Sequence, residues 1–159
     1  MSVDAYERFW MWIAGLLITV FLGAILLTTG LQAVHPPSHI ETIDPTTLAD
    51  DREFGKPGVA VREDGSAVVV VVAQLFSFSP DPIEVPLGKP VTFRLTSADV
   101  IHGFEIVGTN ANAMVVPGYV SQFTVTFERA GEYVIACNEF CGVGHHMMTG
   151  KVVVKKALP

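Results

Sequence analysis

The chain has 159 residues, half of them hydrophobic, and a formal net charge of -6 at pH 7. This length allows one domain of ordinary size with an appendage, and excludes two domains with separate cores. From His35 onward the chain holds fourteen acidic and nine basic residues, an excess of five negative charges, which argues against nucleic acid as a partner.

The N-terminal part predicts a membrane anchor. From Phe9 to Val34 there is no charged residue, and a run of this length suffices for a helix to cross the hydrocarbon core. A cleaved signal peptide is the alternative, but the run is too long for a typical signal peptide and its start is not basic. We therefore expect residues 1–34 to span the membrane once. Arg8, the only basic residue before Arg52, favours an inward N-terminus and an outward domain.

Residues 35–66 are rich in proline and glycine and show little hydrophobic periodicity. This composition is typical of a connector, and we expect it to pack on the following domain. His35 and His39 lie in it without partners at metal-ligand spacing, so we expect them at the surface.

From Ala67 onward, the pattern predicts a domain of short strands over residues 67–159. Residues 67–78 form one β-branched apolar run, and residues 90–97 and 121–127 alternate between apolar and polar side chains. Further short candidates are residues 83–85, 104–107, 133–136 and 151–154. Six or more short strands separated by turn signals indicate an all-β Greek-key sandwich or barrel.

The stretch C-N-E-F-C-G-V-G-H-H-M-M holds the only two cysteines of the chain, Cys137 and Cys141, followed by His145 and Met148. Thiolate and thioether sulfur favour copper, imidazole suits copper as well as zinc, and methionine is not a usual zinc ligand. A disulfide is the alternative interpretation, but it leaves the histidine and methionine at ligand spacing unexplained. The stretch therefore predicts a copper site.

His102 lies in D-V-I-H-G-F, thirty-five residues before Cys137, and is the candidate for a further ligand. One cysteine, two histidines and a methionine would make a mononuclear site. The second cysteine allows both thiolates to bridge two copper ions, with His102 and His145 binding one ion each. Met148 and the backbone carbonyl of Glu139 would then be weak axial ligands. No coordination position is left for a substrate, which indicates electron transfer.

The pattern C-x-E-x-C-G-x-x-H-x-x-M with an upstream D-V-x-H resembles the CuA centre in subunit II of haem-copper cytochrome c oxidases. The short chain, its single anchor and the stretches D-P-I-E-V-P and V-I-H-G-F are similar to the B-type oxidases of prokaryotes. The resemblance implies a cupredoxin-like sandwich after one transmembrane helix. It also implies a dinuclear CuA centre whose metal ligands are His102, Cys137, Glu139, Cys141, His145 and Met148.

The same resemblance implies a function. The chain would take electrons from cytochrome c, or a similar small carrier, and pass them to haem in subunit I, where oxygen is reduced. A small additional helix subunit is a further expected partner. The expected location is the plasma membrane of a prokaryote, with the copper domain on the periplasmic side. The alternatives are a metal-free subunit II of a quinol oxidase and a CuA carrier of another respiratory reductase; a thiol copper chaperone would need an α/β pattern that the sequence lacks.

Some expected features of this family are altered. Where the larger family has a tryptophan-rich stretch for electron uptake, this chain has Phe76 and Phe78, for which a core role is an equal alternative. Asn110, Asn112 and Met114 replace acidic docking residues. These replacements predict a more apolar and less salt-sensitive docking surface.

Three neighbours of the ligands, and the side chain of Glu139, carry separate expectations. We expect His146 to support a ligand or to face another subunit, and Met147 to pack. Asp99 could orient His102 or cap its loop. Whether the side chain of Glu139 binds magnesium is left open.

Overall fold

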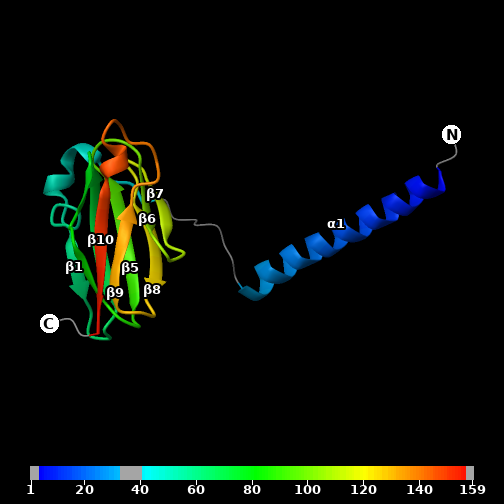
Figure 1. Cartoon of the computed structure of the whole chain (residues 1–159), viewed down its shortest axis with the longest axis horizontal. Coiled ribbons are helices and arrows are strands. Elements are labelled where there is room, and N and C mark those ends of the chain that lie inside the picture. The colour runs from blue at the N-terminus through cyan, green and yellow to red at the C-terminus, as the bar shows by residue number, and fades with distance from the viewer. Residues whose placement is uncertain (1–3, 33–40, 157–159) are drawn as a thin grey trace. The chain divides into compact units, whose positions relative to one another are not determined.

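The computed structural model describes residues 4–32 and 41–156, so the predictions for His35 and His39 lie outside the described residues. The chain divides into two compact units, Met1–His39 and Ile40–Pro159. Both units are drawn in Figure 1.

The first unit is the helix α1, Ala5–Gln32. The side chain of Asp4 accepts a hydrogen bond from the backbone N–H of Tyr6 at 2.9 Å and so caps the first turn. The segment Ala5–Gly30 has a mean hydropathy of 2.3. The helix is long and apolar enough to cross a membrane, and its large apolar side chains are exposed as lipid contact requires.

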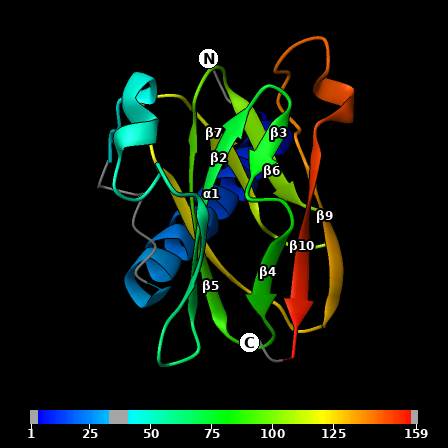
Figure 2. The same ribbon diagram turned by 90° about the vertical axis from the view of Figure 1, so that its left-hand side faces the viewer.

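The second unit consists of two five-stranded sheets. In the first sheet the order is β1-β2-β5-β8, and β3 pairs with the second half of β2. Its strands are β1 (Gly58–Val61), β2 (Ala67–Gln74), β3 (Ser77–Ser79), β5 (Pro90–Ser97) and β8 (Ser121–Thr126). In the second sheet, β4-β10-β9-β6-β7, the strands are β4 (Ile83–Pro86), β6 (His102–Ile106), β7 (Asn112–Val115), β9 (Gly131–Ala136) and β10 (Thr149–Lys155). The predicted all-β sandwich is confirmed (Figures 1 and 2).

The core lies between the sheets, and alternation along the strands fills it. In β5 the predicted inward residues Val91, Phe93 and Leu95 are fully buried. Phe93 and Phe104 meet across the sandwich with ring centroids 5.7 Å apart, and Phe78 packs edge-on against Phe104 at 5.3 Å. Such offset and edge-to-face aromatic pairs stabilise the core beyond the apolar area that they bury.

The β-branched and largely apolar run over residues 67–78 predicted one continuous strand. This prediction is wrong, because the run forms two strands, β2 and β3. The chain turns at Leu75 and Phe76, and β3 folds back so that Ser77 lies opposite Gln74. Hydrophobicity alone does not show such a reversal, because both arms of the hairpin face apolar neighbours. The turn places Phe76 outside the core, which matters for the metal site.

The segment before β2 contains more regular structure than a connector predicts. It includes the 3-10 helix η1, Pro45–Asp50, and strand β1, which pairs antiparallel with β2. Leu48 and Phe54 are buried with Val72 in a small cluster of their own. The segment therefore packs on the first sheet and adds a strand to it.

Candidate metal centre

The loop between β9 and β10, residues 137–148, lies at one end of the sandwich and is orange in Figure 1. Ala136 and Thr149 are opposite each other in the antiparallel ladder, and the backbone N–H of Cys137 donates to the carbonyl of Met148 at 3.2 Å. The two ends of the loop are thus held together by two paired strands. Because its two ends are paired, the loop is held in a defined conformation.

The sulfur atoms of Cys137 and Cys141 are 3.8 Å apart, and both residues are buried. Both cysteines are free, and a disulfide bond would require a separation of about 2.05 Å. A bound ion lies about 2.3 Å from a thiolate, so both sulfurs can reach the same ion. The arrangement fits shared metal ligation and not the disulfide alternative.

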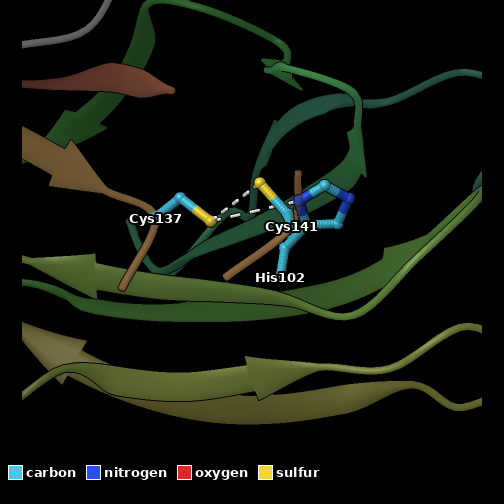
Figure 3. A group of neighbouring side chains, drawn as sticks. All are labelled: His102, Cys137 and Cys141. Carbon is cyan, nitrogen blue, oxygen red and sulfur yellow. Dashed lines mark hydrogen bonds between the residues drawn. The ribbon is translucent and has the colours of Figure 1, made fainter. Parts of the chain in front are cut away.

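His102 is the first residue of β6 and is fully buried. Its Nε2 lies 2.8 Å from Oδ1 of Asp99, and its Nδ1 lies 4.0 Å from the sulfur of Cys137. Because Asp99 engages Nε2, Nδ1 is the nitrogen presented to a metal. The ligand atoms of His102, Cys137 and Cys141 all lie within 4.8 Å of one another (Figure 3).

The other predicted donors surround the same two sulfurs. Nδ1 of His145 lies 3.6 Å from the sulfur of Cys141, and the buried sulfur of Met148 lies 3.7 Å from it. The carbonyl oxygen of Glu139 is 3.3 Å from the sulfur of Cys137. One histidine thus stands beside each cysteine, with a weak donor near each sulfur.

Asp99 both orients His102 and ties down its loop. Its carboxylate accepts from the backbone N–H groups of Val100 at 2.6 Å and Leu75 at 2.7 Å, in addition to its contact with His102. Partial burial raises the pKa of Asp99, but the hydrogen bonds from His102, Val100 and Leu75 outweigh this effect and lower the pKa overall. The carboxylate therefore stays ionised and holds the imidazole in one tautomer.

Burial, followed by the hydrogen bond and the charge repulsion between the two sulfurs, raises the pKa of Cys141 to about 11. In the metal-free chain this thiol is therefore protonated at neutral pH. Binding of a metal cation must displace its proton, which couples metal affinity to pH.

The donor set itself distinguishes between metals. Two thiols, two imidazoles and a thioether converge here, and the thioether sulfur is a ligand of copper sites and not of ordinary zinc sites. The residues therefore fit copper. A rigid sandwich that fixes the geometry before and after a change of charge suits electron transfer.

Phe76 and Phe78 occupy different environments. Phe78 is part of the core, whereas Phe76 is 38% exposed. The ring of Phe76 lies over the loop, where a side chain at Gly144 would come within 2.6 Å of it. Phe76 thus covers the outer side of the metal loop, and only a glycine fits beneath it.

Other predictions concern side chains at this end. Met147 is 68% exposed and does not pack within this chain, so that prediction is wrong: the short helix η2, His145–Met147, directs Met148 inward and Met147 outward. His146 and Met114 are also exposed. Gly103 and Asn138 contact each other beside the ligands and were not predicted; the only signal in the sequence is that each directly follows a ligand.

Comparison with known proteins agrees with this geometry. Residues 69–157 match the family model for the cytochrome c oxidase subunit II periplasmic domain. Cytochrome c oxidase subunit 2 of Thermus thermophilus is 43% identical over 159 residues, covering 98% of this chain and 95% of the relative.

Solved structures give the same result for the fold. A chain of a heme-copper terminal oxidase dimer superposes with a TM-score of 0.70 at 30% identity, covering 94% of this chain and 99% of the other. The periplasmic domain of subunit II of cytochrome oxidase of Bradyrhizobium japonicum superposes with a TM-score of 0.54 at 17% identity, covering 64% of this chain and 88% of the other. This chain therefore belongs to the cytochrome c oxidase subunit II family.

Proposed function

We propose that the six donors His102, Cys137, Glu139, Cys141, His145 and Met148 hold a dinuclear copper centre through which electrons enter the oxidase. The observation that carries the proposal is the pair of buried free sulfurs 3.8 Å apart, with one histidine nitrogen beside each. A mononuclear site would need only one of these sulfurs. In a dinuclear centre both thiolates would serve as shared ligands, and one imidazole would remain for each ion.

Each part of the chain has a role in such a centre. Bound copper supplies a one-electron redox couple. The buried Cys137, Cys141 and Met148 exclude water from it, and the paired strands β9 and β10 keep the donors in place. Asp99 holds His102 with Nδ1 toward the metal. Because these groups are already fixed, little has to reorganise when the charge changes.

Oxygen reduction does not take place at this site, since the six donors leave no coordination position for a substrate. As a subunit II of a haem-copper oxidase, the chain partners subunit I. Subunit I then receives the electron on its haem and carries the oxygen-reducing metals. A metal-free quinol oxidase subunit would not require the full donor set that this chain retains.

The electron donor that fits the surface of the metal loop is a small protein with an apolar contact face, such as a cytochrome c. Phe140 is 80% exposed and Val143 is 93% exposed, and both lie in the loop itself. Leu75 and Phe76 continue this apolar surface on the β2–β3 turn. Exposed apolar groups clustered around a redox site mark a docking surface, and docking of this kind is less dependent on salt than charge-driven docking.

The helix α1 anchors the chain in a membrane, which we assign to the plasma membrane of a prokaryote. We place the copper domain on the periplasmic side, a placement supported by the match to a periplasmic domain. A small additional helix subunit would complete the contacts that a single anchor leaves open. We retain residues 1–34, 35–66 and 67–159 as the limits of anchor, connector and copper domain.

The copper assignment is tested on the full chain in detergent. After loading with copper and removal of excess, metal analysis should find two ions per chain, and the EPR spectrum should show one unpaired electron shared equally between two coppers. One ion per chain with a single intense blue absorption band would contradict the dinuclear assignment. A chain that folds but takes up no copper would support the metal-free quinol oxidase alternative.

The docking surface is tested by the rate at which reduced cytochrome c reduces the loaded oxidase. Val143→Glu should slow the second-order rate several-fold, because it places a charge in the centre of the apolar surface. Val134→Glu is the matched control, since Val134 is also exposed but lies on the face of β9. Equal slowing by both variants, or a strong dependence of the wild-type rate on ionic strength, would contradict apolar docking at the loop.

A further inference from the structure

The polypeptide that follows His102 lies against the polypeptide that follows Cys137. A side chain at Gly103 would lie 2.7 Å from the backbone nitrogen of Asn138 and 2.8 Å from that of Glu139, and would overlap the side-chain oxygen of Asn138. Atoms of a real side chain cannot approach that closely. Glycine at this position therefore lets the two ligand-bearing segments come into contact.

The side chain of Asn138 extends from this contact across the second sheet. Its amide nitrogen is 3.3 Å from Oε2 of Glu105 on β6 and 3.2 Å from Oδ1 of Asn112 on β7. Glu105 and Asn112 are directly opposite each other in the β6–β7 ladder. Gly103 and Glu105, two residues apart on one strand, face the same side of the sheet. Asn138 therefore contacts Gly103 at one point of that face, and Glu105 and Asn112 at another.

Apart from the edge-on contact of the Phe140 ring with His145 at 5.8 Å between centroids, the segment between the two cysteines has few other described contacts. The side chains of residues 138–140 are all exposed, so none of them packs in the core. The carbonyl of Glu139 nevertheless points inward, 3.3 Å from the sulfur of Cys137. The contact of Asn138 with Gly103, Glu105 and Asn112 fixes the two peptide units that precede this carbonyl.

We propose that Asn138 is a positioning residue that holds the Glu139 carbonyl at the metal, an inference that rests on the proposed dinuclear copper site. Asn138 itself touches no metal; it acts by keeping the backbone of its neighbour in place. A weak axial oxygen stabilises the more oxidised state of a copper site and so lowers its reduction potential. Loss of the contact lets the carbonyl turn toward solvent, and the reduction potential rises.

The test measures copper content, reduction potential and EPR hyperfine splitting of the full chain in detergent. Asn138→Ala should keep two coppers per chain, raise the potential, and change the hyperfine splitting, because one copper loses its axial oxygen and the two ions become less alike. Asn110→Ala is the matched control, an exposed asparagine in the turn between β6 and β7, and should leave all three quantities unchanged. Glu105→Gln keeps a side-chain oxygen that can accept from Asn138 and should also resemble the wild type.

A second variant separates positioning from folding. The double substitution Glu105→Ala with Asn112→Ala leaves the loop sequence intact, removes both acceptors, and should raise the potential in the same direction as Asn138→Ala. If Asn138→Ala does not bind copper, this double variant decides, and an unchanged potential and spectrum in it would overturn the proposal. A wild-type chain without two coppers would contradict the proposed function instead, which distinguishes the two failures.

Discussion

Two places in the domain bring together segments that are distant in sequence, and their chemistry is opposite. On the first sheet, Arg94 of β5 forms ion pairs with Glu41 at 2.6 Å and Glu53 at 2.5 Å, both from the segment before β2. At the metal end, Nδ1 of His102 and the sulfur of Cys137 approach to 4.0 Å. In the Arg94 cluster opposite charges are paired, and the hydrogen bonds from Arg94 to the two glutamates raise the pKa of Arg94.

The donors at the metal end do not compensate one another. Once metal binding has deprotonated them, Cys137 and Cys141 repel each other, and the bound cation offsets this repulsion. The Arg94 cluster is therefore complete in the chain alone, whereas the donor cluster is completed by its metal. Stability and redox function should respond to different substitutions, and the following experiments test this separation.

The largest effect is expected at the two sulfurs that we propose as bridging ligands. Cys137→Ser or Cys141→Ser should abolish the shared copper centre, because a hydroxyl is a poor copper ligand and cannot replace a bridging thiolate. Copper content and EPR of the full chain measure the result. Circular dichroism should show that the strands persist in both variants. A shared-electron EPR signal that survives in either variant would contradict the bridging role.

Substitution of Arg94 tests whether the ion-pair cluster on the first sheet stabilises the domain. Arg94→Met keeps most of the side-chain volume but leaves Glu41 and Glu53 unpaired, and should lower the free energy of unfolding by about 2 kcal/mol. The Arg94 side chain is only 16% exposed, so solvent screens it little. Denaturant unfolding followed by circular dichroism measures the change, and the copper EPR spectrum should stay as in the wild type.

Lys155→Met is the matched control for Arg94. Lys155 pairs with Glu84 at 2.6 Å, but the two side chains are 40% and 43% exposed, and exposed pairs contribute at most about 1 kcal/mol. If Arg94→Met altered the copper spectrum, or cost no more than Lys155→Met, the separation between a stabilising end and a redox end would not hold.

A smaller effect is expected at Met148. Met148→Leu conserves the volume of this buried side chain and removes a weak axial sulfur. The chain should keep two coppers with a shifted reduction potential, because the axial ligand tunes the site more than it holds the metal. Potentiometric titration measures the shift. Complete loss of copper would mean that Met148 is needed to retain the metal.

The smallest effect is expected at Asp51, which holds the turn that presents Glu53 to Arg94. Hydrogen bonds from the backbone N–H groups of Phe54 and Glu53 lower the pKa of Asp51 below its usual 3.8. Its stabilising contribution is therefore present above pH 3.8 and is lost as the pH falls through the lower folded-state pKa. Thermal unfolding of the copper-free chain between pH 5 and pH 2 should show a weaker pH dependence for Asp51→Asn. An identical dependence in wild type and variant would exclude this contribution.

Patterns along single strands were predictable, whereas contacts between distant segments were not, with the exception of His102, which the sequence grouped with Cys137 across thirty-five residues. The alternation of Val91, Phe93 and Leu95 directly reflects one buried face. The turn at Leu75 was missed because its residues are as apolar as the strands on both sides. The contact between Gly103 and Asn138 joins the start of β6 to the metal loop, and their proximity depends on the pairing of β6 with β9. No local pattern encodes that pairing.

The metal site shows the same difference between local patterns and contacts of distant segments. Cys137, Cys141, His145 and Met148 lie in one loop, so their spacing alone indicated a metal site. The role of Asp99 stayed open in the sequence, because orienting a histidine and capping a loop require the same residue type. The structure shows that a single carboxylate makes both sets of contacts.

The position of β10 also determines when the metal site can assemble. This strand follows Met148 directly and lies between β9 and β4, pairing in parallel with residues some seventy positions earlier in the chain. Such distant pairs form late, because closure of a long loop costs entropy before any contact is gained. The donor loop acquires its closed base only when β10 docks. The donor loop is accordingly complete only when the whole domain has folded, and a chain that ended before β10 would lack the strand that closes the loop.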